Sequence, residues 1–119
     1  MISVKDYQAV KETLNKYLEA GKQGKSEIMK PAFHKDAIMY TSADGNVSGG
    51  AIQGLFDYID NNPAAPEIKA EITSIEIAGN IAYAQVESDN WHGERFSDMF
   101  LLLKDNGDWK IITKVFYTN

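Results

Sequence analysis

Apolar residues near the N-terminus recur at three- and four-residue steps, which places them on one face of a helix. Ser3, followed by Asp6, is a suitable N-cap, and Gly21 and Gly24 supply an end. The pattern therefore predicts a first helix that carries Val4, Tyr7, Val10, Leu14, Tyr17 and Leu18.

The pattern then changes from helical to extended. Ser26 can cap a short second helix, whose length Pro31 limits because proline has no backbone N–H to donate. Residues 37–41 read as a strand, and Asp44-Gly45-Asn46 reads as a hairpin turn. Val47-Ser48 is predicted to be a brief return strand that ends at Gly49-Gly50.

The strongest amphipathic signal follows, and after it the chain is mostly extended. Ile52, Leu55, Phe56 and Ile59 lie at i, i+3, i+4 and i+7, which predicts a third helix that stops before Pro63. Four strand-like runs then occupy residues 67–78, 81–92, 94–104 and 109–118, separated by short turns. The expected order is ααββαββββ in one α+β domain spanning residues 1–119.

Both faces of the predicted sheet carry apolar side chains. If each turn has two central residues, counting outward from the turns places Glu87 opposite Asp98 and puts both on one face with Phe96, Phe100 and Val115. The opposite face receives Met99, Leu101, Leu103 and Phe116, with Lys110 and Lys114 as charged exceptions. Since monomers seldom expose large apolar patches, we expect the helices to cover one face and a second copy to cover the other, giving a homodimer through the outer face of the sheet.

Composition narrows the classes of function. The chain has 119 residues and a net charge of -5, with no dense Lys/Arg run, so nucleic acid is not an expected partner. Without a membrane-spanning apolar stretch or a signal-peptide core at the start, the expected location is the cytoplasm, with no membrane partner. Cysteine is absent, which leaves oxygen and imidazole groups for any chemistry. His34, Asp36 and His92 lack metal-ligand spacing, so we expect neither a metal nor a cofactor.

Two motifs and the element order carry a resemblance to a known superfamily. The order ααββαββββ, with Phe33-His34-Lys35-Asp36-Ala37 entering the first strand and Asp105-Asn106-Gly107-Asp108-Trp109 closing the last hairpin, resembles the NTF2-like superfamily over essentially the whole chain. The segment 95–104, RFSDMFLLLK, resembles the branch called Putative lumazine-binding, which is related to the SnoaL-like and ketosteroid-isomerase-like groups. The resemblance implies a cone-shaped, strongly bent sheet around the first helix, a pocket at its open end, and dimerisation by the outer face.

The ketosteroid-isomerase-like group also implies specific site residues. Its members stabilise an enolate with a helix-1 Tyr and a protonated strand Asp, which match Tyr17 and Asp98. The position of the base falls near Thr41, whose hydroxyl cannot accept a proton at neutral pH. This departure argues against steroid-type isomerisation.

Asp98 is the leading candidate on the residues alone. Between Phe96 and Phe100 and opposite Glu87, its carboxyl would be desolvated and repelled by a like charge, and both effects favour the neutral, protonated form. It could serve as a hydrogen-bond donor to a ligand, or simply satisfy itself by bonding Tyr17 or Glu87. Glu87 is the candidate base, and Trp91 fits either the mouth of the cone or an interface.

Three functions remain open: binding of a small apolar or partly aromatic molecule, catalysis of the isomerase, dehydratase or cyclase type, and a filled cone that serves only as an interaction domain. Asp98, Tyr17 and Glu87 are the catalytic candidates. The expected lining of the pocket is Tyr17, Tyr40, Glu87, Phe96, Asp98, Phe100 and Val115.

Overall fold

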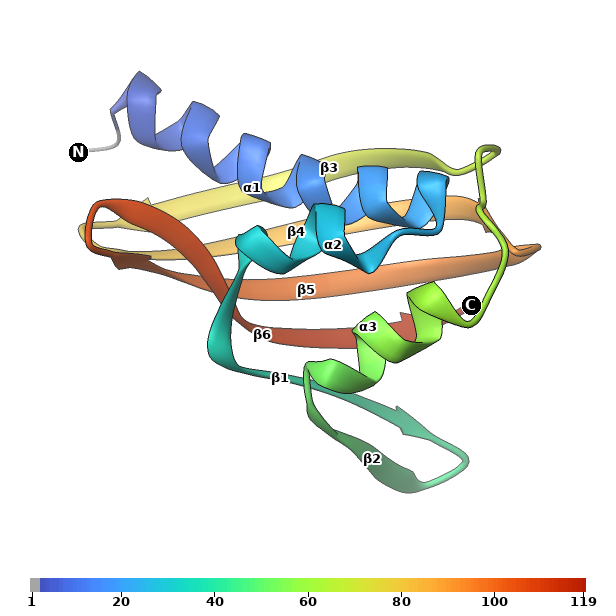
Figure 1. Cartoon of the computed structure of the whole chain (residues 1–119). Helices are drawn as coiled ribbons and strands as arrows, with labels where there is room; N and C mark the ends of the chain where they lie inside the picture. The colour runs from blue at the N-terminus through green and yellow to red at the C-terminus, as the bar shows by residue number, and fades with distance from the viewer. Residues whose placement is uncertain (1–2) are drawn as a thin grey trace.

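A computed structural model describes residues 3–119 as helices packed on a single sheet (Figure 1). The helices are α1 (Val4–Gln23), α2 (Ser26–Met29) and α3 (Gln53–Asp60), with a 3₁₀ turn at Lys30–Ala32. The strands are β1 (Phe33–Ala43), β2 (Asn46–Ala51), β3 (Lys69–Ala78), β4 (Ile81–Trp91), β5 (Glu94–Asp105) and β6 (Asp108–Thr118). The predicted order ααββαββββ is confirmed.

Helix α1 begins and ends where its sequence predicts. The Ser3 hydroxyl accepts a hydrogen bond from the backbone N–H of Asp6 at 3.0 Å, which satisfies one free donor of the first turn. Gly24 takes the left-handed conformation (φ 69°) and donates its N–H to the carbonyl of Ala20. Val10 and Leu14 on the apolar face of α1 are fully buried, so the helix forms the centre of the core.

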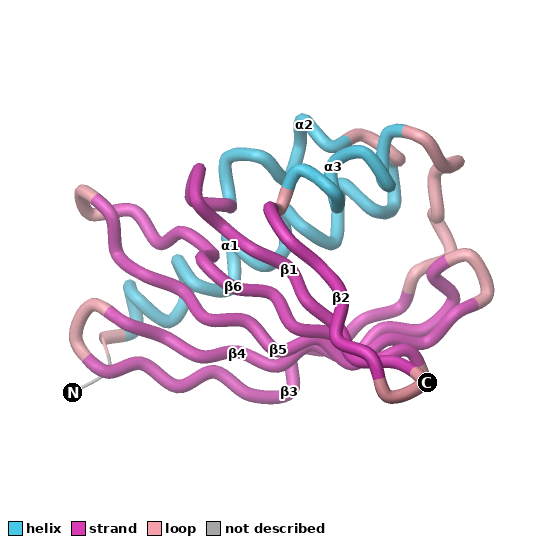
Figure 2. Tube along the Cα trace, turned by 90° about the horizontal axis from the view of Figure 1, so that it is seen from below, coloured by secondary structure: helices cyan, strands magenta, loops and turns pink. Residues whose placement is uncertain are grey.

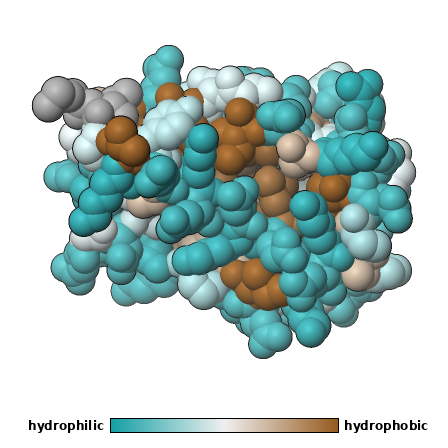
Figure 3. Space-filling model, turned by 90° about the horizontal axis from the view of Figure 1, so that it is seen from above, coloured by the Kyte–Doolittle hydropathy of each residue, from teal (hydrophilic) through white to brown (hydrophobic). Residues whose placement is uncertain are grey.

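The six strands form one sheet in the order β2-β1-β6-β5-β4-β3, antiparallel except for the parallel pair β1–β6. All three helices lie on the same side of this sheet (Figure 2). We call that side the inner face and the opposite side the outer face. Viewed from above, the molecule is largely hydrophilic with separate hydrophobic patches (Figure 3). No helix among residues 3–119 is long and apolar enough to cross a membrane.

Two local predictions were wrong. Ser26 lies inside α2 instead of capping it, and its hydroxyl donates to the Asp60 carboxylate at 2.7 Å, which ties α2 to the end of α3. Gly49 and Gly50 do not end the second strand, because both lie within β2. A Cβ at Gly49 would collide with the carbonyl oxygen of Met39, so glycine here permits close pairing with β1.

The predicted pairing of Glu87 with Asp98 was also wrong. Near the β4–β5 turn, Trp91 pairs with Glu94 but Ser88 pairs with Phe96, so β4 contains one extra residue. Asn90, in this bulge, has a positive φ of 62°. The extra residue shifts the register by one, so that Asp98 faces Val86.

A second bulge changes which face β6 presents. Leu102 pairs with Ile111 and Leu101 with Thr113, so Ile112 is the extra residue. Beyond it, Phe100 pairs with Lys114, and Lys114 therefore shares the inner face with buried Phe100. The sequence had predicted Lys114 on the opposite face from Phe100, and the bulge is the physical reason for the difference.

The outer face stays rich in exposed apolar side chains. Leu101 is 51% exposed and Tyr117 60% exposed, although both belong to central strands. The large apolar residues exposed on this face are Ile38, Tyr40, Val47, Ile81, Met99, Leu101, Leu103, Val115 and Tyr117. Among the residues described, no helix covers them.

Candidate functional site

The centre of the candidate site is the carboxylate of Asp98 on β5, which is completely buried. The Tyr17 hydroxyl on α1 donates a hydrogen bond to Asp98 Oδ2 at 2.8 Å. The two residues are 81 positions apart in the chain, so only the packing of α1 on the sheet brings them together. Of the two partners that the sequence offered for a self-satisfied Asp98, Tyr17 and Glu87, Tyr17 is the one that contacts it.

Lys114 on β6 approaches the same carboxylate from the other side. Its Nζ lies 3.4 Å from Asp98 Oδ1, and both side chains are at most 5% exposed. Asp98 Oδ1 accepts no hydrogen bond from residues 3–119, so the ion pair is its main electrostatic partner. Lys114 Nζ also lies 3.9 Å from Met39 Sδ and 4.3 Å from the centre of the Phe116 ring.

Burial shifts the pKa values of Tyr17 and Lys114, the two residues that contact Asp98. Burial, and secondarily the Asp98 charge, raises the pKa of Tyr17 well above its usual value, so its hydroxyl stays a neutral donor. Burial lowers the pKa of Lys114, and the Asp98 carboxylate opposes that shift. Asp98 therefore receives the Tyr17 hydroxyl at one oxygen and faces the Lys114 amine at the other. One of the two reasons for expecting a neutral Asp98 was Glu87 across the strand, and the bulge in β4 removes Glu87 from that position.

A cavity of about 200 Å³ opens beside this cluster, between α1, α3 and the inner face of the sheet. Its lining residues are apolar or aromatic apart from Lys114. The lining residues are Tyr17, Met39, Leu55, Tyr58, Trp91, Phe96, Lys114 and Phe116. Two of the three members of the Tyr17–Asp98–Lys114 cluster therefore line the cavity.

Trp91 adds an unsatisfied polar group to this wall. Its ring is buried and packs 5.2 Å from the Tyr17 ring, centre to centre. Its indole N–H is buried and donates to no acceptor among residues 3–119. Buried donors are nearly always paired in proteins, so this N–H is an exception.

The residues predicted to line the pocket divide between the two faces. Tyr17 and Phe96 line the cavity, and Phe100 packs edge-on against the Tyr17 ring with centres 5.3 Å apart. Tyr40 and Val115 pair with each other on the outer face, so neither reaches the cavity. Glu87 lies on the outer face as well, where the Ser97 hydroxyl donates to its carboxylate at 2.8 Å. Glu87 is not placed to act on anything in the cavity.

Lys114 was not among the residues predicted to line the pocket. Lys114 was assigned to the outer face because the strand was counted without its bulge. One signal was available: Lys114 lies among apolar residues in β6, and a lysine there needs a buried partner if it faces inward. Met39, Leu55, Tyr58 and Phe116 were also absent from the predicted lining.

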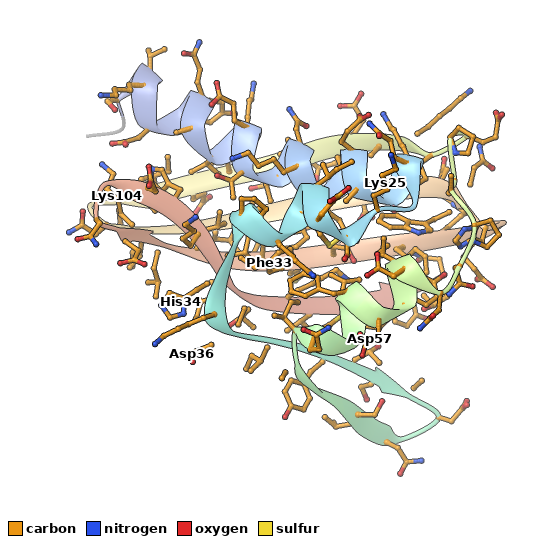
Figure 4. The ribbon with its side chains drawn as sticks, viewed as in Figure 1. Lys25, Phe33, His34, Asp36, Asp57 and Lys104 are labelled. Atoms are coloured by element: carbon orange, nitrogen blue, oxygen red, sulfur yellow. The ribbon has the colours of Figure 1, made fainter. Side chains whose placement is uncertain are left out.

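The histidines stand apart from the Tyr17–Asp98–Lys114 cluster. Figure 4 shows His34 and Asp36 at the start of β1, where His34 Nδ1 accepts the backbone N–H of Asp36 at 3.0 Å. His92 contacts Tyr58 Oη at 3.0 Å and the carbonyl of Pro63 at 2.7 Å, beside the cavity wall. Within residues 3–119, no three His, Cys, Asp or Glu side chains are grouped to hold a metal ion.

A second hollow, of about 400 Å³, lies on the outer face over β3, β4, β5 and β6. Its lining includes Ile77, Ile81, Leu101, Leu103 and Ile112. Apart from Glu76 and Tyr83 the lining side chains are apolar, so this hollow offers contact area with little chemistry.

A bent six-stranded sheet with helices on one face, and a buried polar cluster beneath the first helix, defines an NTF2-like protein. The chain belongs to the family described as Putative lumazine-binding, whose model matches residues 5–117. The predicted superfamily and fold are thereby confirmed.

Two solved structures and one relative found by sequence are similar to this chain. A crystal structure of an NTF2-like protein of unknown function from Shewanella baltica OS155 has 43% identity and a TM-score of 0.95, covering 100% of this chain and 98% of that one. Aldolase FrzH from Cladobotryum sp is 33% identical over 118 residues, which are 98% of this chain and 94% of that protein. A ketosteroid isomerase-like protein from Erwinia carotovora atroseptica has 13% identity and a TM-score of 0.72, covers 98% of each chain, and shows the fold alone.

Proposed function

We propose that this protein binds a small, partly apolar carbonyl compound in the cavity beneath α1 and removes a proton from the carbon next to the carbonyl. The observation that carries the proposal is the Tyr17–Asp98–Lys114 cluster, in which Tyr17 and Lys114 line an apolar cavity and Asp98 lies directly behind them. A buried ion pair is a costly choice for stability alone, because desolvation of the two charges offsets their attraction. Paired ionisable groups in such a cavity are typical of sites that move protons.

The chemistry of the cavity fits such a compound. Aromatic walls favour a flat, apolar body, and the Lys114 amine in the lining can donate to a carbonyl oxygen. The family description names lumazine, a flat ring system with carbonyl groups, and the relative Aldolase FrzH is named for chemistry that begins with an enolate or its equivalent. Both names agree with a carbonyl-bearing ligand.

Asp98 is the proton acceptor in this proposal. It lies 3.4 Å from Lys114 Nζ, which lines the cavity, and Tyr17 holds its other oxygen in place. A neutral hydroxyl and a cation beside the carboxylate can stabilise negative charge on an enolate oxygen. The same first step serves isomerases, dehydratases, cyclases and aldolases.

Exchange of α-protons for deuterium tests the proposal directly. 4-Phenylbutan-2-one, a ring-bearing ketone, is incubated with the protein in D₂O, and loss of the α-proton signals is followed by NMR. We expect exchange above the buffer rate, and a fall of about 10²–10³-fold in Asp98→Asn, the scale of losing a positioned proton acceptor. Glu87→Gln carries the rival prediction from the sequence and should leave the rate unchanged. Exchange no faster than in buffer, together with no binding by native mass spectrometry, would remove the proposal.

We also propose that the protein is a homodimer through the outer face. The exposed apolar residues of that face and the adjoining 400 Å³ hollow would be covered by a second copy, which a monomer would otherwise leave in water. Glu87 Oε2, which is buried without a hydrogen-bond partner among residues 3–119, would find a donor there. Light scattering should give twice the chain mass of 13.3 kDa.

A further inference from the structure

Lys114 is an unusual residue for the wall of an apolar cavity. The bulge at Ile112 turns its side chain to the inner face, where only 4% of the residue is exposed. Lysine is among the residues that are least often buried, because its ammonium group loses strong hydration. A lysine in this position needs either a very good structural partner or a function.

The partners of Lys114 are poor for an ammonium ion. Three N–H donors face one carboxylate oxygen at 3.4 Å and one thioether sulfur at 3.9 Å, and residues 3–119 provide Nζ with no other hydrogen-bond acceptor. The aromatic rings of Phe116 and Tyr17, centred 4.3 and 5.5 Å from Nζ, add attraction but no acceptor oxygen. A lysine with a purely structural role in a buried ion pair would have hydrogen-bond acceptors for its N–H groups.

This setting favours the neutral amine more than a surface position does. Burial lowers the pKa of Lys114, and desolvation in an apolar wall is a known way to activate a lysine as a nucleophile. Asp98 Oδ1, which accepts no hydrogen bond, is free to take the proton that the ammonium releases. The Lys114 amine thus has a proton acceptor, Asp98, on one side and the cavity on the other.

We propose that Lys114 forms a Schiff base with the carbonyl carbon of an aldehyde or ketone held in the cavity, so that the reaction proceeds through an enamine. This inference rests on the proposed function, since it names the covalent route by which the α-proton becomes acidic. The substrate class is a small ketone or aldehyde with an α-hydrogen and an apolar or aromatic body.

The steps balance with the residues present. The Lys114 ammonium gives a proton to Asp98, and the Nζ lone pair attacks the carbonyl carbon while the carbonyl oxygen takes that proton from Asp98. The new C–N bond carries a protonated nitrogen, which returns one proton to Asp98. Asp98 then protonates the hydroxyl, which leaves as water while the nitrogen lone pair forms the C=N bond.

The resulting iminium ion makes the adjacent C–H acidic. The Asp98 carboxylate takes the α-proton, and the C–H electron pair moves into a C=C bond to give the enamine. That carbon can then attack a second carbonyl compound, whose oxygen recovers the proton from Asp98. Hydrolysis of the remaining C=N bond consumes the one water released and frees Lys114. Tyr17 acts as a positioning residue that holds Asp98 Oδ2.

Reductive trapping on the wild-type protein tests the inference. The protein is incubated with 4-phenylbutan-2-one and sodium cyanoborohydride, and the adduct is located by peptide mass spectrometry as a mass increase equal to the ketone less one oxygen. We expect Lys114 to be labelled at least about tenfold faster than the surface residues Lys25 and Lys104, because binding in the cavity raises the local concentration of the carbonyl. Figure 4 shows these two control lysines at the α1–α2 junction and near the β5–β6 turn.

Two outcomes separate this inference from the proposed function. If α-proton exchange is fast but Lys114 is labelled no faster than Lys25 and Lys104, the Schiff base is wrong and the proton-transfer proposal stands. If neither exchange nor binding of the ketone is seen, the proposed function fails first. Labelling of Lys114 with exchange supports both.

Two lysine-to-arginine substitutions on β6 provide a second test of the Schiff base. Lys114→Arg keeps the positive charge beside Asp98 but cannot form an imine at neutral pH, and we expect it to lose both labelling at this position and exchange. Lys110→Arg is the matched control on the same strand, where Lys110 Nζ donates to the carbonyl of Pro31. Retention of exchange in a folded Lys114→Arg protein, as judged by circular dichroism, would overturn the inference.

Discussion

The two faces of the sheet handle polarity in opposite ways. The inner face buries an ion pair between Asp98 and Lys114, whereas the outer face leaves Leu101, Val115 and Tyr117 in contact with solvent. A sheet covered by helices on one face normally does the reverse, with apolar groups inside and charges outside. The two faces therefore differ in the kind of partner that we propose for each, a small molecule for the inner face and a second copy for the outer face.

The two carboxylates on adjacent strands make the same contrast at the scale of one residue. Asp98 is fully buried beside a cation, whereas Glu87 is half-buried on the outer face beside the Ser97 hydroxyl. They differ because strand residues alternate between faces and the register places Glu87 opposite Ser97. Identical chemical groups thus receive different environments from a single step along the sheet.

The largest effect is expected from breaking the inner ion pair. Lys114→Met should lower the free energy of unfolding by about 3–5 kcal/mol, because it leaves the buried Asp98 carboxylate without its cation. Lys104→Met is the control: its partner Asp6 is partly exposed, so water replaces the lost contact and the change should be small. Urea unfolding followed by tryptophan fluorescence measures both. Equal losses of unfolding free energy would mean that the buried ion pair contributes no more to stability than the partly exposed one.

The next largest effect is expected at the outer face, in the dissociation constant of the proposed homodimer. Leu101→Glu should weaken the homodimer by at least about 10²-fold, since it sets two like charges in a buried apolar contact. Val4→Glu, on α1 and also 73% exposed, should leave the oligomeric state unchanged, because α1 lies on the inner face. Light scattering over a dilution series gives the dissociation constants. A wild-type protein that is monomeric at every concentration would contradict the interpretation of this face.

A smaller effect is expected where α1 approaches the inner wall. A Cβ at Gly21 would lie 2.5 Å from the Trp91 ring, so Gly21→Ala should destabilise the fold by about 1–3 kcal/mol through overpacking. Gly54→Ala in α3 meets no atom within 4 Å and should be neutral or stabilising by up to about 1 kcal/mol. Thermal unfolding compares the two variants. A stabilised Gly21→Ala would show that Trp91 is free to move.

The smallest effect is a dependence on pH that comes from Lys114. Its pKa is lowered on folding, so between that lowered value and about 10.5 the unfolded state binds more protons and stability rises with pH. The slope from one group cannot exceed about 1.4 kcal/mol per pH unit. The stability of wild type relative to Lys114→Met should therefore increase from neutral pH toward about pH 9.5, measured by urea unfolding. Above about pH 10 the raised pKa of Tyr17 acts in the opposite direction, since the unfolded tyrosine loses its proton first.

The sequence by itself determined the elements and their order. The spacing of Val10, Leu14 and Tyr17, the Ser3 cap and the glycine after the helix are local signals, and each formed the predicted structure. The same local logic identified the four long strands, whereas the pair Tyr17 and Asp98 came from the resemblance to the ketosteroid-isomerase-like group.

Only the tertiary structure decided which residues share the cavity. Strand side chains alternate with a period of two, so one inserted residue reverses every position beyond it, and the bulges at Asn90 and Ile112 did this twice. They removed Glu87 from the face of Asp98 and brought Lys114 to it. A bulge depends on how two strands and the helices above them pack together, and a pattern along one strand does not contain that information.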